Sequence, residues 1–262
     1  MATTASALAK KALHAHFDVT SSNAGTPSPP NNNVHILLAA TGSVATVKLP
    51  LITQSLLGYQ NVEVQVVATK HAKRFFDADK LLRQGVKVWV DDDEWKNWVD
   101  VKDHILHIEL RRWAHLLLIA PMSANTLAKM ANGICDNLLV CTSIIRAWNT
   151  HNPILIAPAM NTYMYSHPIT AKHLAYVKEN MPWVQIIQPI EKVLACGDIG
   201  MGGMCEWGEI VGKVSRQFQL VQRRRSSFTN AGDEYTEVRM GNNAQDEEDV
   251  RMEEERNAKD SL

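Results

Sequence analysis

The chain has 262 residues, 45% of them hydrophobic, and a formal net charge of −1 at pH 7. This length and apolar content are sufficient for one large folded domain with a sizeable core. No apolar run reaches the roughly 20 residues of a membrane helix, and no basic surface interleaved with aromatic residues stands out, so we expect neither a membrane nor a nucleic-acid partner.

The cysteines favour a reducing compartment. They form no CxxC pair and no spacing typical of a zinc site, and no signal peptide precedes them. We therefore expect reduced thiols, no bound metal and a cytoplasmic protein. The four cysteines are Cys135, Cys141, Cys196 and Cys205.

Both ends of the chain are predicted to be disordered tails. Residues 1–33 are rich in Ala, Thr, Ser, Asn and Pro and end in "TPSPPNNN". Residues 222–262 lose hydrophobic periodicity, and within them residues 233–262 hold eleven acidic and four basic side chains, a net charge of −7. The rest of the chain therefore carries +6, which suits an anionic small ligand. The predicted folded domain spans residues 34–221.

Within this domain, continuous apolar runs alternate with helix-length segments. Strands buried on both faces are predicted at 34–40, 62–68, 115–121, 153–159 and 184–189. Helices are predicted at 44–59, 70–84, 104–114, 123–147 and 168–181. This alternation indicates an α/β fold, a single doubly wound parallel-sheet domain of the flavodoxin-like Rossmann type.

Polar residues follow three of the predicted strands. They are "TGSV" at 41–44, "TKH" at 69–71 and "PMSANT" at 121–126, each at the expected start of a helix. Ligands of doubly wound sheets bind outside the carboxyl ends of the strands, and a helix N-terminus there favours an anion. Taken singly, each segment is equally well explained as a helix cap. Together they predict one site for a phosphate-bearing ligand.

Two further segments carry candidate reactive side chains. "HILHIELRRWAH" places His104 and His107 near a short predicted helix, where a histidine is either structural or catalytic. The glycine-rich segment 194–210, "LACGDIGMGGMCEWGEI", is expected to be a long loop that covers a substrate. Its cysteines are either inert or reactive, and sequence rules alone do not choose.

Four segments in chain order resemble the homo-oligomeric flavin-containing cysteine decarboxylases, in particular those of coenzyme A biosynthesis. They are "TGSVA", "HIELRRWAHLLLIAPMSANTLAKMANGICDNLL", "PILIAPAMNTYMY" and "LACGDIGMGGM", and the resemblance covers about residues 34–218. The third segment matches the family signature Pro-x-Met-Asn-x-x-Met-Trp through Pro158, Met160, Asn161 and Met164.

The resemblance implies FMN as the cofactor and a set of site residues. His107 and Cys196 are the implied catalytic residues, and Asn161 is expected to bind the substrate carboxylate. Ala195 and Met204 are expected to lie near the substrate. The implied FMN-binding residues are Gly42, Ser43, Val44, Thr69, Ser123, Ala124, Asn125, Thr126 and Ala159.

The implied reaction converts 4'-phosphopantothenoylcysteine to 4'-phosphopantetheine. A simple loss of CO2 from a cysteine carboxylate would leave an unstabilised carbanion. Oxidation of the thiol-bearing carbon to a thioaldehyde provides an acceptor for those electrons, and decarboxylation then gives an ene-thiol. His107 is expected to assist this step as a base or as a carboxylate anchor, and Cys196 is expected to donate the proton when the ene-thiol is reduced.

The family also implies an assembly. Its active sites form between neighbouring subunits, with His107 and Asn161 contributed by different protomers, so a homotrimer of this chain would be complete. Three positions depart from the family pattern: Tyr165 replaces a tryptophan, His71 a small hydroxyl residue and Val193 a basic residue.

Other functions remain open on this fold. Fungal relatives regulate protein phosphatases and carry acidic C-terminal tails, as this chain does at "DEEDVRMEEER". A solvated, disordered terminus explains the acidic run better, because the run is short and diluted by arginines. A peptide-cysteine decarboxylase or a flavin prenyltransferase also fits the fold, but fits "ACGD" less well.

Overall fold

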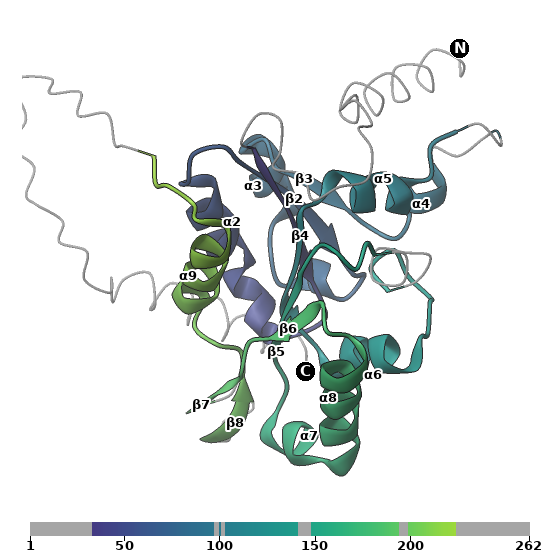
Figure 1. Cartoon of the computed structure of the whole chain (residues 1–262), viewed down its shortest axis with the longest axis vertical. Helices are drawn as coiled ribbons and strands as arrows, with labels where there is room; N and C mark the ends of the chain where they lie inside the picture. The colour runs from purple at the N-terminus through teal and green to yellow at the C-terminus, as the bar shows by residue number, and fades with distance from the viewer. Residues whose placement is uncertain (1–32, 97–99, 101–102, 141–147, 194–198, 224–262) are drawn as a thin grey trace, which may run out of the picture.

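A six-stranded parallel sheet forms the centre of the computed structural model, which describes residues 33–96, 100, 103–140, 148–193 and 199–223 (Figure 1). Its strands are β1 (Val34–Ala40), β2 (Val62–Ala68), β3 (Lys87–Trp89), β4 (Leu116–Met122), β5 (Ile154–Pro158) and β6 (Val184–Ile186). The strand order is β3-β2-β1-β4-β5-β6, so the order reverses between β1 and β4. Without the short edge strand β3, the other five follow the 2-1-3-4-5 order of flavodoxin-like sheets. The predicted fold class is confirmed.

Helices cover both faces of this sheet. The 3-10 helices are η1 (Val44–Lys48) and η2 (Ala72–Arg74); the α-helices are α2 (Leu49–Leu57), α3 (Ala78–Arg83), α4 (Asp93–Lys96), α5 (Leu106–Trp113), α6 (Ala124–Asn132), α7 (Thr162–Ser166), α8 (Pro168–Asn180) and α9 (Trp207–Phe218). Helices α2 and α9 pack on one face, and α5, α6 and α8 pack on the other (Figure 1). Among the described residues, no helix has the length and apolar character needed to cross a membrane.

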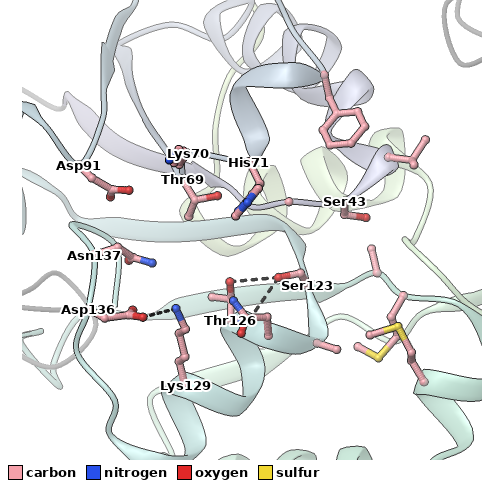
Figure 2. A pocket seen from close by; sticks show the side chains of 18 residues that line it. Ser43, Thr69, Lys70, His71, Asp91, Ser123, Thr126, Lys129, Asp136 and Asn137 are labelled. Atoms are coloured by element: carbon pink, nitrogen blue, oxygen red, sulfur yellow. Dashed lines mark hydrogen bonds and ion pairs between the residues drawn. The ribbon is translucent and has the colours of Figure 1, made fainter. Parts of the chain in front are cut away.

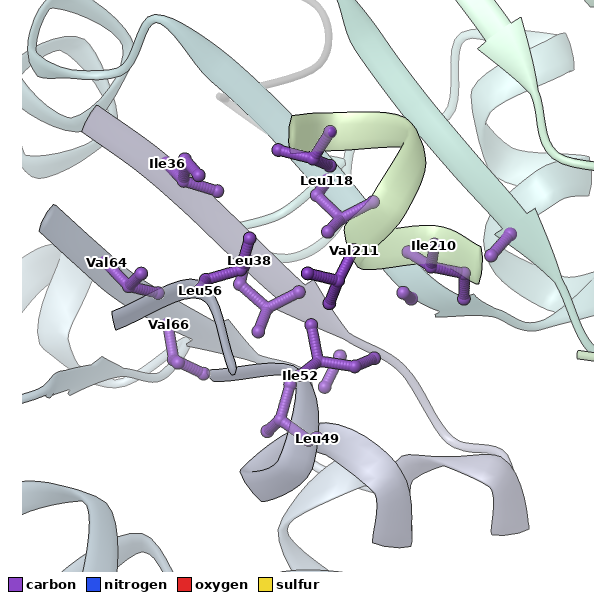
Figure 3. Packing of buried hydrophobic residues seen from close by; sticks show 14 of the residues in the cluster. Ile36, Leu38, Leu49, Ile52, Leu56, Val64, Val66, Leu118, Ile210 and Val211 are labelled. Carbon is purple, nitrogen blue, oxygen red and sulfur yellow. The ribbon is translucent and has the colours of Figure 1, made fainter. Parts of the chain in front are cut away.

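Strand β1 shows why a continuous apolar run becomes a central strand. Ile36 and Leu38 point to the face of α2 and α9, whereas Leu37 and Ala39 point to the opposite face. All four side chains are fully buried. Figure 3 shows the first of these two cores, where Leu38 lies close to side chains of the flanking helices. Burial of each large aliphatic side chain contributes about 1.5–3 kcal/mol to the stability of the fold. This burial holds β1 in the centre of the sheet, whose strand ends position the site.

Several predicted helices are shorter than expected. The helix predicted at 123–147 ends at Asn132, because Gly133 adopts a left-handed conformation with φ of 65° and caps it. The segment 70–84 divides into η2 and α3, because Asp77 accepts hydrogen bonds from two backbone N–H groups and starts a new helix. The segment 44–59 begins with the 3-10 helix η1 before α2.

The segment 194–210 is not one long loop, and that prediction was wrong. Strand β8 (Ile199–Gly203) pairs antiparallel with β7 (Ile190–Val193), and α9 begins at Trp207. Glycines hide this strand from sequence patterns, since they have low strand propensity. Here Gly202 is needed for close approach: a Cβ on it would lie 2.5 Å from the Met160 carbonyl oxygen, and its φ is +128°. Residues 194–198 lie outside the described part of the chain.

Candidate functional site

The ends of β1, β2 and β4 are joined by hydrogen bonds at the reversal of the strand order. The Thr41 hydroxyl donates to the Pro121 carbonyl oxygen at 2.9 Å and accepts from the Ser123 backbone N–H at 2.8 Å. The Thr69 backbone N–H donates to the Ala40 carbonyl oxygen at 3.1 Å. Because Thr41 is fully buried, these bonds lock the strand ends into one rigid edge.

A cavity of about 680 Å³ opens at this edge (Figure 2). All the residues predicted to bind FMN line it: Gly42, Ser43, Val44, Thr69, Ser123, Ala124, Asn125, Thr126 and Ala159. The structure therefore brings these separate segments together around one cavity, as the sequence predicted. Their individual roles stay predictions.

The cavity offers hydrogen-bond donors for an anionic group. Ser123 is the N-cap of α6 and accepts from the Thr126 backbone N–H at 3.3 Å, which leaves earlier N–H groups of the helix for a ligand. Lys70 and His71 line the same cavity. Gly42 allows the walls to approach: a Cβ there would lie 2.8 Å from Cβ of His71. A cavity of this volume with such donors fits a cofactor that joins a phosphate to a flat apolar ring.

Sequence reasoning missed one wall of the cavity. Asp91, Lys129, Asp136 and Asn137 line it, and Lys129 Nζ lies 2.5 Å from Asp136 Oδ2. Asp91 accepts a hydrogen bond from the backbone N–H of Leu138 at 3.0 Å, which joins the chain after β3 to the chain after α6. The only signal that could have placed Asp91 at the cavity was strand β3, which precedes it. With three residues, β3 is too short to show a strand period in the sequence.

Asn161 lies at the start of α7 with a free amide group. Its Oδ1 accepts from the Met164 backbone N–H at 2.7 Å and caps the helix, so its amide nitrogen points away from the backbone. No other described residue accepts from that nitrogen. The neighbouring Tyr163 is 77% exposed. Asn161 can therefore donate to a carboxylate brought to this surface.

His107 lies on α5 and does not line the cavity. Its Nδ1 is 2.5 Å from Oε1 of Glu94 on α4, and both residues are buried. Helices α5 and α7 lie at opposite ends of the molecule in Figure 1. One chain therefore does not bring His107 and Asn161 together.

The remaining predicted residues divide into described and undescribed ones. Met204 is buried in the core beside α9, although a position near the substrate was expected. Burial, with Glu209 and Glu206 nearby, raises the pKa of the Cys205 thiol, which favours its protonated form. Ala195 and Cys196 lie outside the described residues. Across the described ranges, no group of three acidic, histidine or cysteine side chains is arranged to hold a metal ion.

The three departures from the family pattern take distinct positions. Tyr165 packs half-buried against the core on the side of α8, so its ring contributes to packing where the family has a tryptophan. His71 lines the cavity, and its side chain lies where a Cβ on Gly42 would point. Val193 is the last residue of β7.

Comparison with known proteins agrees with this geometry. A family model described as Flavoprotein matches residues 25–219. The phosphopantothenoylcysteine decarboxylase of Oryza sativa subsp. japonica is 46% identical over 207 residues, a match covering 79% of this chain and 89% of that protein. A solved structure of a PPC decarboxylase mutant complexed with pantothenoylaminoethenethiol has 45% identity and a TM-score of 0.67. That alignment covers 71% of this chain and 99% of the other.

Some fungal relatives are much longer than the matched region. A Schizosaccharomyces pombe protein named "Probable thymidylate synthase" is 58% identical over 193 residues, which cover 74% of this chain but 31% of that protein. The chain spans about a third of the length of three such fungal relatives, from 31% to 35%. The matched region is the part that carries the sheet and its cavity. The chain belongs to the flavoprotein family that includes the phosphopantothenoylcysteine decarboxylases.

Proposed function

We propose that this chain catalyses the FMN-dependent decarboxylation of 4'-phosphopantothenoylcysteine to 4'-phosphopantetheine, a step of coenzyme A biosynthesis. The observation that carries the proposal is the single cavity at the strand-order reversal, lined by all nine residues predicted to bind FMN. The decarboxylase from Oryza sativa, most of whose length this chain covers, supports the substrate.

The chain's own residues fit FMN. Ser43 and the N-terminal N–H groups of α6 would hold the phosphate, and Ala159 would lie against the ring. When bound, FMN supplies a reversible two-electron acceptor, by which the thiol-bearing carbon becomes a thioaldehyde and the later ene-thiol is reduced to the product.

The substrate carboxylate would be held from two sides. The Asn161 amide nitrogen would donate to it, because Asn161 Oδ1 is already engaged by the Met164 N–H. The Nε2 atom of His107 would assist the carboxylate or move a proton beside it. CO2 leaves as its bonding electrons pass to the thioaldehyde carbon and sulfur, which gives the ene-thiol. Cys196 would donate the proton that completes the reduction.

The separation of His107 and Asn161 supports a homotrimer as part of this proposal. A side chain at one end of a protomer can meet one at the other end through head-to-tail contact, and a ring of such contacts closes with rotational symmetry. Exposed apolar residues suit this contact beside Asn161: Tyr163 is 77% exposed and Ile199 on β8 is 73% exposed. We also propose a cytoplasmic location, in line with the free thiols of Cys135 and Cys205 in the described part of the chain.

The test uses the full chain, purified and reconstituted with FMN. Visible absorbance reports the flavin, and release of CO2 and 4'-phosphopantetheine from 4'-phosphopantothenoylcysteine reports turnover. Cys196→Ser should release CO2 but accumulate the ene-thiol. Cys205→Ser is the matched control and should behave as wild type, because Cys205 does not line the cavity. A chain that cannot be loaded with FMN would overturn the proposal.

A second candidate function is regulation of a protein phosphatase. It is favoured by the net charge of −7 over residues 233–262, which a basic partner surface would attract. The same experiment separates the two: a yellow protein without turnover on 4'-phosphopantothenoylcysteine would favour the regulatory function.

A further inference from the structure

A buried carboxylate lies against the histidine expected to act on the substrate. Glu94 Oε1 is 2.5 Å from His107 Nδ1, and the two side chains are 3% and 10% exposed. The residues come from different helices, α4 and α5, so the contact is made by the fold and not by neighbours in sequence.

The pair is costly for stability. The second oxygen of Glu94, Oε2, is buried and has no hydrogen-bond partner among the described residues. A buried carboxylate with an unsatisfied oxygen costs free energy, and a buried ion pair seldom repays that cost through attraction alone. An apolar residue at position 94 would pack as well, so stability alone does not account for a carboxylate there.

The contact sets which ring nitrogen of His107 carries the proton. An ionised carboxylate accepts hydrogen bonds but does not donate them, so this contact favours the tautomer in which His107 Nδ1 holds the hydrogen. The two ring nitrogens point to different sides of the imidazole, and Nε2 accepts or donates no hydrogen bond to another described residue. Nε2 is therefore the atom that faces a ligand, with its protonation open to change.

Arg111 on α5 has a buried Nε without a hydrogen-bond partner among the described residues, whereas the neighbouring carboxylates Glu109 and Asp93 are already engaged. Glu109 lies 3.4 Å from His104 and 3.0 Å from Arg112, and Asp93 accepts from the Val90 backbone N–H at 2.9 Å. Glu94 is thus the carboxylate that holds His107 in the described part of the chain.

We propose that Glu94 is a positioning residue for the decarboxylation: it fixes the Nδ1–H form and the ring orientation of His107, so that Nε2 meets the substrate carboxylate. This inference rests on the proposed function. The buried carboxylate lowers stability but keeps the imidazole of His107 in one tautomer and one orientation. Acidic residues orient catalytic imidazoles in this way at other sites.

The kinetic test compares two replacements of Glu94 in the FMN-loaded full chain. Glu94→Leu removes the acceptor and should lower kcat about 100-fold, with KM changed less than about 3-fold, because binding contacts remain. Glu94→Gln keeps an amide oxygen that accepts from Nδ1 and should recover part of the rate, to roughly 10-fold below wild type. Asp92→Asn, an exposed carboxylate two residues away, is the matched control and should keep wild-type kcat.

A spectroscopic test reports the tautomer without any turnover. The ring nitrogen signals of ¹⁵N-histidine-labelled protein distinguish Nδ1–H from Nε2–H, and loss of a signal in His107→Asn assigns it. Wild type and Glu94→Gln should show Nδ1–H, whereas Glu94→Leu should move the proton to Nε2.

A wild-type kcat in Glu94→Leu, or a tautomer that stays unchanged in that variant, would overturn the proposal. A purely structural role would lower the unfolding midpoint without either effect. Absence of turnover in wild type would instead contradict the proposed function, and the nitrogen spectra would still decide whether Glu94 holds the ring.

Discussion

The cavity at the strand ends and the pair His107 and Asn161 are built in different ways. The cavity is complete within one chain, because the carboxyl ends of parallel strands meet at one edge and Thr41 joins them. His107 and Asn161 lie on helices at opposite ends of the molecule (Figure 1). One region is thus fixed by the sheet, and the other would be completed by a neighbouring copy in the homotrimer proposed above.

The difference shows what a doubly wound sheet can and cannot position alone. Backbone pairing brings residues distant in sequence to within hydrogen-bond reach along one edge. Peripheral helices such as α5 and α7 share no such edge, so the fold of one chain does not bring their side chains together.

The largest expected effect comes from mixing two inactive variants. His107→Asn keeps a donor toward Glu94 but removes Nε2, and Asn161→Asp keeps the helix cap but removes the donor amide. Each alone should lower kcat/KM by about 100-fold or more. Suppose that each site takes its histidine and its asparagine from different protomers. Random assembly of the two variants in equal amounts then gives trimers of which three quarters contain both variants, and each of these has one intact site out of three. Co-expressed chains should therefore recover about a quarter of wild-type activity.

The measurement is turnover of the co-expressed pair, with each variant expressed alone as the control. Both variants should retain visible flavin absorbance, because neither residue lines the cavity. No recovery in mixed assemblies of confirmed mass would contradict a site shared between protomers.

Gly42→Ala should weaken flavin binding about 10- to 100-fold. Its Cβ would lie 2.8 Å from Cβ of His71, which belongs to the backbone-near part of that side chain and cannot swing aside. Such overpacking costs about 1–3 kcal/mol, which corresponds to that change in affinity. Fluorescence titration with FMN measures it. Gly208→Ala is the control, since no atom lies within 4 Å of the added Cβ; equal affinity in both variants would contradict a tight cavity wall.

The long buried strands and the cavity could be predicted from the sequence for a physical reason. Central parallel strands are apolar on both faces, as β1 and β4 are, so their residues are visible as continuous runs. The polar residues after them, such as Ser123, act through local backbone groups. The topology then brings these local motifs together without any further information.

Other features depend on contacts that no local pattern contains. Glycine-rich β8 is a strand only because Gly202 fits against the Met160 carbonyl. Asp91 lines the cavity from the end of a three-residue strand. The Glu94–His107 contact joins two short helices, and nothing in "DDDEWK" distinguishes that glutamate from its acidic neighbours. These contacts are tertiary, so propensity and periodicity do not report them.

The amino-terminal edge of the sheet, opposite the cavity, carries a stack of aromatic rings. His35 stacks on Trp113 and on His115, with ring centroids 4.7 and 4.8 Å apart. The His35 backbone N–H donates to His115 Nδ1 at 3.1 Å, which requires an unprotonated nitrogen. Burial, together with the nearby His35, lowers the pKa of His115 to about 4.

This stack predicts a pH dependence of stability that is separate from function. Between pH 6.5 and about 4, an unfolded chain binds a proton at His115 that the folded chain does not, so the free energy of unfolding falls as the pH is lowered through this window. Because the ring is only half-buried and partly screened, we expect a loss on the order of 1 kcal/mol. His115→Gln keeps an acceptor for the His35 N–H and does not titrate, so urea unfolding at pH 7 and pH 4.5 should show a smaller difference than in wild type. Flavin affinity at pH 7 should be unchanged, since His115 lies at the edge remote from the cavity. Equal pH dependence in the two proteins would instead assign the acid sensitivity to other groups, and altered flavin affinity would show that the two edges of the sheet are coupled.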